Sequence, residues 1–228
     1  MKSVVLLSGG LDSCTCLAIE VDKWGANNVK AVAFNYGQKH LVELDHAKAI
    51  ARYYDVELTV LTIDSNLYAQ ADSTLLQGNG EMNHGKSYSE ILKSTDVVDT
   101  YVPFRNGLML SQAAAYAYSV GASLVVYGAH ADDAAGGAYP DCTPKFYESM
   151  SHAIEYGTGG KVYMQAPLIS LTKAEVVRWG TELDAPYHLT RSCYEEGEIS
   201  CGTCATCIDR KEAFHKNGMT DPIIYKGE

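Results

Sequence analysis

The chain has 228 residues, of which 46% are hydrophobic and 20% are charged, and its net charge is −10. These values fit a soluble globular protein of one α/β domain, or of one domain with a small appendage, and allow a sizeable core. The negative charge argues against a nucleic-acid partner, because the surface as a whole would repel phosphates. No secretory signal follows the first methionine, and no stretch approaches the length of a membrane span. We therefore expect a cytoplasmic protein with no membrane partner, whose seven cysteines serve as thiols or metal ligands rather than in disulfides.

The first feature is a turn with two glycines, between a predicted strand at residues 4–7 and a predicted helix that runs to Trp24. Its sequence is Ser-Gly-Gly-Leu-Asp-Ser at residues 8–13. The glycines allow a sharp turn, and the start of the helix offers free N–H groups and the positive end of its dipole. We therefore predict a site for an anion, most naturally a phosphate group. The alternative is a plain strand-to-helix turn in which Asp12 or Ser13 is the helix N-cap.

Strands and helices alternate along the chain that follows. Further buried strands are predicted at residues 29–34, 56–63 and 124–128, and a fifth, edge-like strand at residues 161–167. Apolar residues at helical spacing separate the first three strands, which predicts a doubly wound, mainly parallel five-stranded sheet in the α/β class. Residues 64–100 form a polar excursion with at most a short helix near residues 67–76, and such inserts usually act as lids or binding elements.

Polar and aromatic residues follow two of the predicted strands at their carboxyl ends, where open parallel sheets bind ligands. Residues 35–40 follow the second strand and include Tyr36, Gln38 and His40, although a solvated loop would look similar. Residues 129–142 follow the fourth strand. Their imidazole, phenol and carboxylate groups favour a small-molecule pocket over a turn-rich surface loop, and three carboxylates could hold Mg²⁺. The candidates here are His130, Asp132, Asp133, Tyr139 and Asp141.

Two cations lie near predicted helix starts. Arg105, followed by Asn106, precedes a helix and could hold a carboxylate or a phosphate, or form a surface salt bridge. Thr172 and Glu175 match a capping box, which predicts a helix from Lys173 onward. A lysine in the first turn opposes the helix dipole unless it reaches an anion, and a pyrophosphate bound at residues 8–13 would be one.

Four cysteines near the C-terminus follow the pattern Cys-x7-Cys-x2-Cys-x2-Cys, namely Cys193, Cys201, Cys204 and Cys207. Four thiolates suit a tetrahedral Zn²⁺, so we predict one structural zinc ion that holds the C-terminal segment. An iron–sulfur cluster is one alternative, because ferredoxins use a similar spacing. Disulfides are the other, and the expected compartment disfavours them.

The segment at residues 8–13 resembles the pyrophosphate loop of the ATP pyrophosphatases, and several segments together resemble the 7-cyano-7-deazaguanine synthases of queuosine biosynthesis. The second resemblance covers residues 4–210, although the loop at residues 131–138 is longer than the family pattern. It implies an adenine nucleotide alpha hydrolase-like, Rossmann-like fold. It also implies a nucleotide-binding domain at residues 1–186 and a zinc-binding segment at residues 187–228 packed on that domain. The segments that carry it are residues 8–13, 36–40, 102–106, 139–142, 167–176 and 192–207.

The resemblance further implies a ligase that uses ATP, Mg²⁺ and ammonia, in a homodimeric protein. ATP would activate 7-carboxy-7-deazaguanine as an acyl-adenylate, ammonia would give the amide, and a second activation would give the nitrile, 7-cyano-7-deazaguanine. The residues that it places in catalysis are Ser8, Asp12, Ser13 and Lys173. Those placed at ATP are Leu7, Ser8, Gly9, Gly10, Leu11, Asp12, Ser13, Phe34, Arg105 and Gly128. Those placed at the substrate are Tyr36, Gln38, His40, Asn106, His130, Asp132, Asp133, Tyr139 and Asp141.

Two other functions fit parts of the sequence. A sulfur-transferring, tRNA-modifying enzyme with the same pyrophosphate loop would adenylate a base carbonyl and use the four cysteines for a cluster, but the acidic net charge argues against tRNA binding. A zinc-containing binding module without catalysis would have no need of the intact pyrophosphate loop. Iron analysis separates the first from a synthase, and an ATP–pyrophosphate exchange assay separates the second.

Overall fold

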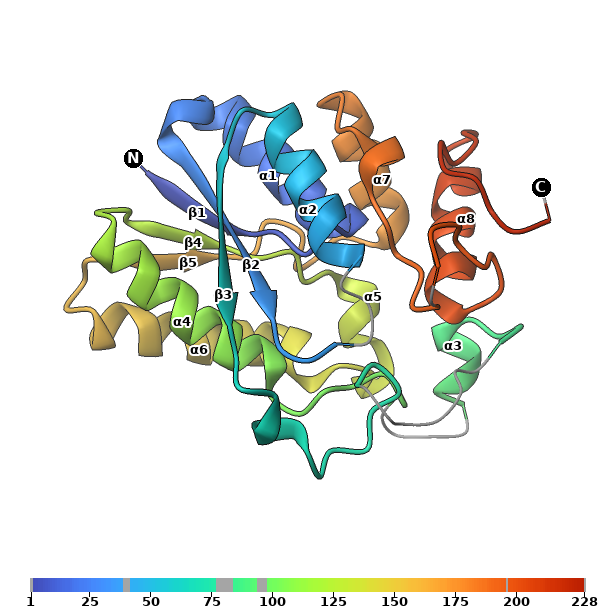
Figure 1. Ribbon diagram of the computed structural model, residues 1–228, viewed down its shortest axis with the longest axis horizontal. Coiled ribbons are helices and arrows are strands. Elements are labelled where there is room, and N and C mark those ends of the chain that lie inside the picture. The colour runs from blue at the N-terminus through green and yellow to red at the C-terminus, as the bar shows by residue number, and fades with distance from the viewer. Residues whose placement is uncertain (1, 39–41, 77–83, 94–97, 196, 228) are drawn as a thin grey trace.

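The computed structural model describes residues 2–38, 42–76, 84–93, 98–195 and 197–227 (Figure 1). Its centre is a five-stranded sheet in the order β3-β2-β1-β4-β5, and every neighbouring pair of strands is parallel. This confirms the predicted doubly wound sheet. The strands are β1 (Ser3–Leu6), β2 (Val29–Asn35), β3 (Glu57–Thr62), β4 (Leu124–Val126) and β5 (Tyr163–Gln165).

Helices cover both faces of the sheet. On one face lie α1 (Leu11–Trp24), α2 (Val42–Tyr53) and α7 (Lys173–Glu182), and on the other lie α4 (Arg105–Ser119) and α6 (Pro144–Gly157) (Figure 1). The connections between parallel strands run through these helices, as such a sheet requires. The result is a three-layer α/β/α arrangement.

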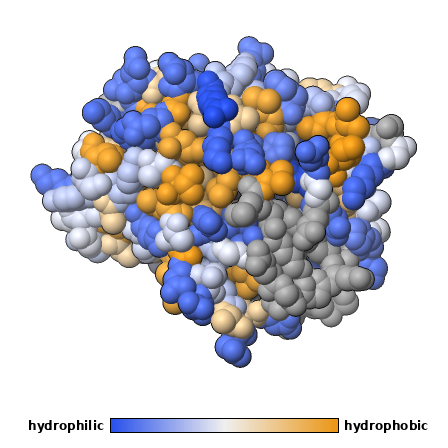
Figure 2. All heavy atoms as spheres, viewed as in Figure 1, coloured by the Kyte–Doolittle hydropathy of each residue, from blue (hydrophilic) through white to orange (hydrophobic). Residues whose placement is uncertain are grey.

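The apolar side chains of the central strand β1 point to both faces of the sheet, so both faces must be packed with helices. Val4 and Leu6 pack in the hydrophobic cluster on the α4 and α6 side, whereas Val5 and Leu7 pack in the cluster on the α1 side. Successive side chains of a strand point to opposite faces, so an uninterrupted apolar run fits a strand that is buried on both. The edge strand β3 is less covered, and its Val60 is 43% exposed. Figure 2 shows that hydrophobic residues also reach the surface on the face viewed.

The polar excursion contains little regular structure in its described parts. A 3-10 turn spans Ser65–Tyr68 and the short helix α3 spans Tyr88–Ile91, so the helix expected near residues 67–76 is reduced to one turn at its start. The fifth strand lies at the sheet edge, as predicted, but is shorter than expected. Among the described residues, no helix has both the length and the apolar character needed to cross a membrane.

The chain after α7 folds back onto the sheet domain. Helix α8 (Ala205–Lys216) packs against α7, and the buried Arg210 on α8 makes a two-pronged contact with Asp221 at 2.7 and 3.0 Å. The same guanidinium donates to the Tyr187 carbonyl oxygen and the Thr190 hydroxyl. A buried cation with this many acceptors is well satisfied, so it fixes the C-terminal segment to the preceding chain.

Candidate functional site

A cavity of about 520 Å³ opens at the carboxyl ends of β1, β2 and β4. Its volume suits a small molecule, and its position is the one at which open α/β sheets bind ligands. The structure brings together at this cavity most of the residues predicted from sequence. These are Leu7, Ser8, Gly10, Asp12, Ser13, Phe34, Tyr36, Gln38, Arg105, Asn106, Gly128, His130, Asp132, Asp133, Tyr139 and Lys173.

The remaining predicted residues are placed differently. Gly9 and Leu11 belong to the same turn but do not line the cavity, and Leu11 is fully buried in the core. Asp141 also lies off the cavity wall, because its carboxylate accepts a hydrogen bond of 2.9 Å from the Asn106 backbone N–H at the start of α4. His40 lies outside the described residues.

The turn at residues 8–13 is held open by its own hydrogen bonds. Ser13 Oγ donates to the Gly10 carbonyl oxygen at 3.0 Å and accepts from the Ser8 backbone N–H at 3.2 Å. Helix α1 begins at Leu11 with Gly10 as its N-cap and with no side-chain cap, so neither Asp12 nor Ser13 is the N-cap. Amide groups of the first turn are thus left for a ligand, and an anion suits them.

A chain of ionisable side chains in contact crosses one end of the cavity. Lys173 Nζ donates to Asp12 Oδ2 at 2.6 Å and lies 3.2 Å from His130 Nε2, which is 3.3 Å from Asp133 Oδ1. Burial would raise the pKa of Asp12, but Lys173 and His130 outweigh it and hold that pKa below its ordinary value. Burial prevails at Asp133, where it raises the pKa. Asp12 therefore stays ionised at lower pH than the neighbouring Asp133.

The position of Lys173 follows from local sequence. The predicted capping box is present: Thr172 Oγ1 accepts from the Glu175 N–H, and the Glu175 carboxylate accepts from the Thr172 N–H at 2.8 Å. In addition, the Lys173 backbone N–H donates to Asp132 Oδ2 at 2.7 Å. These contacts fix the start of α7 and direct the Lys173 side chain to the turn of α1, although the two segments are far apart in sequence.

The second end of the cavity is built around Arg105. Its guanidinium donates to the Tyr36 hydroxyl at 2.9 Å, and Tyr139 and Tyr194 also line the wall. The preceding residue, Phe104, has a φ of 55°, a left-handed conformation that is costly for a residue with a side chain. The strained start of α4 thus places Arg105 in the cavity, and no described carboxylate lies within ion-pairing distance of it.

Sequence reasoning missed several cavity residues. Glu43 lies in the first turn of α2 and Arg191 follows the 3-10 turn Tyr187–Leu189, and both line the cavity. Burial raises the pKa of Glu43 to about 7, although Arg105 and Arg191 act in the opposite direction. Glu43 lies beside apolar residues at helical spacing, so its sequence context indicated only a helix surface. No pattern in the sequence pointed to Arg191.

Arg191 connects the turn of α1 to the cysteine region. Its backbone N–H donates to the Gly9 carbonyl oxygen at 2.9 Å. Its buried guanidinium donates to the carbonyl oxygens of Glu195 at 2.7 Å and Glu198 at 3.0 Å. Tyr194, in the same segment, lines the cavity. The segment before Cys201 is therefore part of the cavity wall as well as of the cysteine site.

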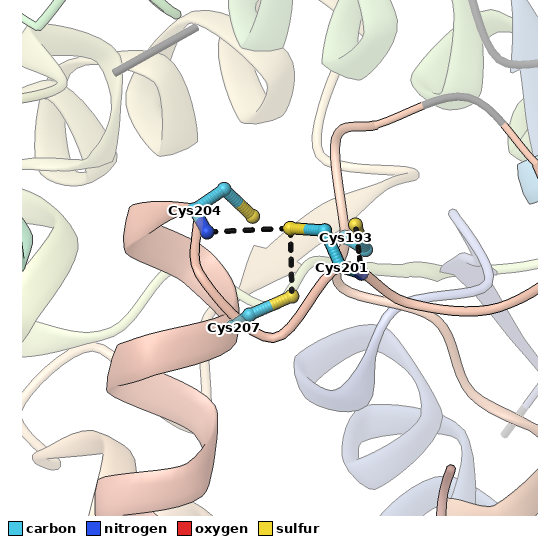
Figure 3. A group of neighbouring side chains, drawn as sticks. All are labelled: Cys193, Cys201, Cys204 and Cys207. Carbon is cyan, nitrogen blue, oxygen red and sulfur yellow. Dashed lines mark hydrogen bonds between the residues drawn. The ribbon is translucent and has the colours of Figure 1, made fainter. Parts of the chain in front are cut away.

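The four predicted metal ligands converge. The sulfur atoms of Cys193, Cys201, Cys204 and Cys207 all lie within 4.8 Å of one another, and Figure 3 shows the side chains pointing toward a common centre. The backbone N–H groups of Cys201 and Cys204 donate to the sulfurs of Cys193 and Cys201. Such N–H···S contacts stabilise thiolates, so the donor set fits a metal that binds four sulfurs.

Comparison with known proteins gives consistent matches over nearly the full chain. The family model for "Queuosine biosynthesis protein QueC" matches residues 2–218. A 7-cyano-7-deazaguanine synthase of Oceanobacillus iheyensis is 41% identical over 234 residues, which cover 98% of each chain. A protein of the same name from Thermoplasma volcanium is 40% identical over 228 residues, covering 98% of this chain and 90% of the relative.

A solved structure supports the fold alone. The U34-tRNA thiolase NcsA of Methanococcus maripaludis matches with a TM-score of 0.51 at 16% sequence identity. The match covers 95% of this chain and 67% of that one. At this level of identity the similarity concerns the arrangement of strands and helices and carries no statement about chemistry.

Proposed function

Because the chain belongs to the QueC family of queuosine biosynthesis proteins, we propose that it is an ATP-dependent ligase that makes 7-cyano-7-deazaguanine from 7-carboxy-7-deazaguanine and ammonia. The observation that carries the proposal is the cavity itself. An uncapped helix start, Lys173 and Arg105 meet there, and these groups suit a triphosphate and a carboxylate.

The reaction needs two activations. The substrate carboxylate attacks the α-phosphorus of ATP and pyrophosphate leaves, because a free carboxylate is a poor electrophile. Ammonia then attacks the acyl carbon, loses a proton and displaces AMP, which gives the amide. The amide oxygen attacks the α-phosphorus of a second ATP and displaces a second pyrophosphate. Loss of AMP from the carbon and of two protons from the nitrogen then leaves the nitrile.

The residues of the chain have distinct parts in this proposal. The amide groups at the start of α1, with Ser8 and Ser13, would donate hydrogen bonds to the pyrophosphate end of ATP, and Lys173 would share its charge with the leaving group. Arg105 would hold a phosphate or the substrate carboxylate. Fixed donors of this kind stabilise developing charge without reorganising, and orientation of the two substrates supplies much of the remaining rate enhancement.

We propose two metal ions. Mg²⁺, when bound, would neutralise charge on pyrophosphate, and Asp12 fits it because its Oδ1 atom is buried and accepts no hydrogen bond from the described residues. One structural Zn²⁺ would be held by the four cysteines, whose sulfurs have the number and mutual spacing for a tetrahedral ion. Metal analysis of the purified protein distinguishes zinc from an iron–sulfur cluster.

Three further properties belong to the proposal. Residues 187–228 would act as a zinc-binding segment packed on the nucleotide-binding domain at residues 1–186, which the contact between α7 and α8 supports. The protein would work in the cytoplasm as a homodimer and bind neither nucleic acid nor membrane. Light scattering of the purified protein tests the dimer.

The direct test is incubation of the protein with 7-carboxy-7-deazaguanine, ATP, magnesium and ammonium, followed by mass spectrometry. We expect the nitrile together with AMP and pyrophosphate. A Ser8→Ala protein should form all three products more slowly than the wild type. Formation of ADP, or wild-type turnover by the variant, would contradict the proposed chemistry.

A further inference from the structure

Glu43 differs from the other carboxylates that line the cavity. Asp12 is paired with Lys173, Asp132 accepts a backbone N–H, and Asp133 lies beside His130. Of the two acidic residues on α8, one accepts from the Tyr88 backbone and the other pairs with a lysine. Glu43 has no hydrogen bond and no ion pair with any described residue, although it is half-buried. A half-buried carboxylate on a cavity wall, with no donor among the described residues, keeps its acceptor oxygens available, so a ligand that supplies N–H donors gains affinity there.

The surroundings of Glu43 select the kind of donor. Arg105 and Arg191 are the charged groups whose fields reach it, and both lower its pKa. Two nearby arginines make the local potential positive, which disfavours a cation such as ammonium. Tyr36, whose ring lies close enough for Glu43 to affect its pKa, also lines the cavity and provides a flat wall. A neutral, planar group with N–H donors is therefore the best match to this carboxylate.

The proposed reaction requires the protein to distinguish two heterocycles, and a planar edge with N–H donors would allow Glu43 to do so. Two similar fused-ring heterocycles, the adenine of ATP and the deazaguanine, must enter one cavity and take different places. The deazaguanine edge opposite the carboxyl group carries two adjacent donors, the ring N1–H and the exocyclic amino group. Adenine carries a lone pair at the corresponding ring nitrogen. A carboxylate accepts both donors of the first and repels the second.

We propose that Glu43 is the specificity-determining residue that binds the N1–H and 2-amino edge of the substrate and keeps adenine out of that place. This inference rests on the proposed function. The same carboxylate faces the substrate edge farthest from the reacting carboxyl group, and like charges keep that group away from Glu43. The bound heterocycle is thereby turned with its carboxyl group away from Glu43.

The test compares Glu43→Gln with the wild type by calorimetry. Glutamine keeps the size of the side chain but presents an amide NH₂ to a ligand donor. We expect the dissociation constant of 7-carboxy-7-deazaguanine to rise roughly 100-fold, as for loss of a charged hydrogen-bonded pair. Binding of an ATP analogue that cannot be cleaved between its α and β phosphates should change less than about threefold, within ordinary surface effects. Asp45→Asn is the matched control, because Asp45 lies exposed on the same helix and, among the described residues, forms an ion pair with Lys48 alone, at 2.8 Å.

A second arm changes the ligand instead of the protein alone. Wild-type protein should bind 7-carboxy-7-deazaguanine more tightly than the analogue without its 2-amino group by about tenfold or more, and Glu43→Gln should lose most of this preference. Weakened ATP binding with unchanged substrate binding would mean that Glu43 holds the ribose hydroxyls, and it would overturn the inference. So would a wild-type protein that does not discriminate the analogue. If the wild type neither binds nor converts the carboxylate, the proposed function itself fails.

Discussion

Replacing Gly9 by alanine measures how closely the turn of α1 packs on α2. Gly9 has a φ of +89°, where a residue with a side chain costs about 1–2 kcal/mol. A Cβ atom at this position would overlap the Glu43 carbonyl oxygen and would lie 3.0 Å from both the Ala47 nitrogen and the His46 Cβ. Helix backbone cannot yield cheaply, so the overlap adds about 1–3 kcal/mol. We expect Gly9→Ala to lower the free energy of unfolding by roughly 2–5 kcal/mol in total.

Gly218→Ala is the matched control for this measurement. Gly218 has a φ of +68°, but an added Cβ would meet nothing within 4 Å. This variant should therefore lose only the conformational cost of about 1–2 kcal/mol. Urea unfolding followed by circular dichroism gives both values, and calorimetry should show weaker nucleotide binding in Gly9→Ala alone. Equal destabilisation by the two substitutions would refute the close packing of the turn on α2.

Three further outcomes follow from the same geometry. Lys173→Met removes the cation at the turn, so the rate of carboxylate-dependent ATP–pyrophosphate exchange should fall by about 100-fold or more. The control Lys48→Met, on the exposed side of α2, should keep the wild-type rate. Equal exchange rates in the two variants would contradict the role assigned to Lys173. Because burial raises the pKa of Glu43 to about 7 against Arg105 and Arg191, the residue ionises as the pH rises through that value. Calorimetry should then show substrate affinity rising by up to about tenfold per pH unit below 7 and levelling off above it, and a flat profile would count against Glu43 as an acceptor. Removing the metal with a chelator should lower the melting temperature, because four-ligand sites contribute folding energy; unchanged melting with the metal gone would argue against a structural role.

Local patterns predicted the parts of the site that depend on neighbouring residues. The apolar run followed by Ser-Gly-Gly-Leu-Asp-Ser predicted β1, the turn and α1. Thr172 and Glu175 predicted the start of α7, and the cysteine spacing predicted the convergence of four sulfurs. In each case the chemistry needs only residues close in sequence, so a single chain reveals it.

The missed residues depend on distant segments. Glu43 becomes a cavity residue only because Gly9 lets α2 approach the turn, and Arg191 only because its N–H bonds the Gly9 carbonyl oxygen. Phe104 adopts a left-handed conformation that its residue type does not favour, since its ring packs against Gly107, where a larger residue would collide. Packing between distant segments decides the places of Glu43 and Arg191, whereas a contact three residues along the chain accompanies the Phe104 conformation; no local propensity signals any of the three.

Oxygen labelling tests the central claim, that the substrate carboxylate is activated by attack on the α-phosphorus of ATP. The protein would be supplied with 7-carboxy-7-deazaguanine carrying ¹⁸O in both carboxyl oxygens, together with ATP, magnesium and ammonium. Mass spectrometry should find one labelled oxygen in each AMP released and none in pyrophosphate, with both labels lost from the nitrile. Label in inorganic phosphate or pyrophosphate, or AMP free of label, would contradict the mechanism.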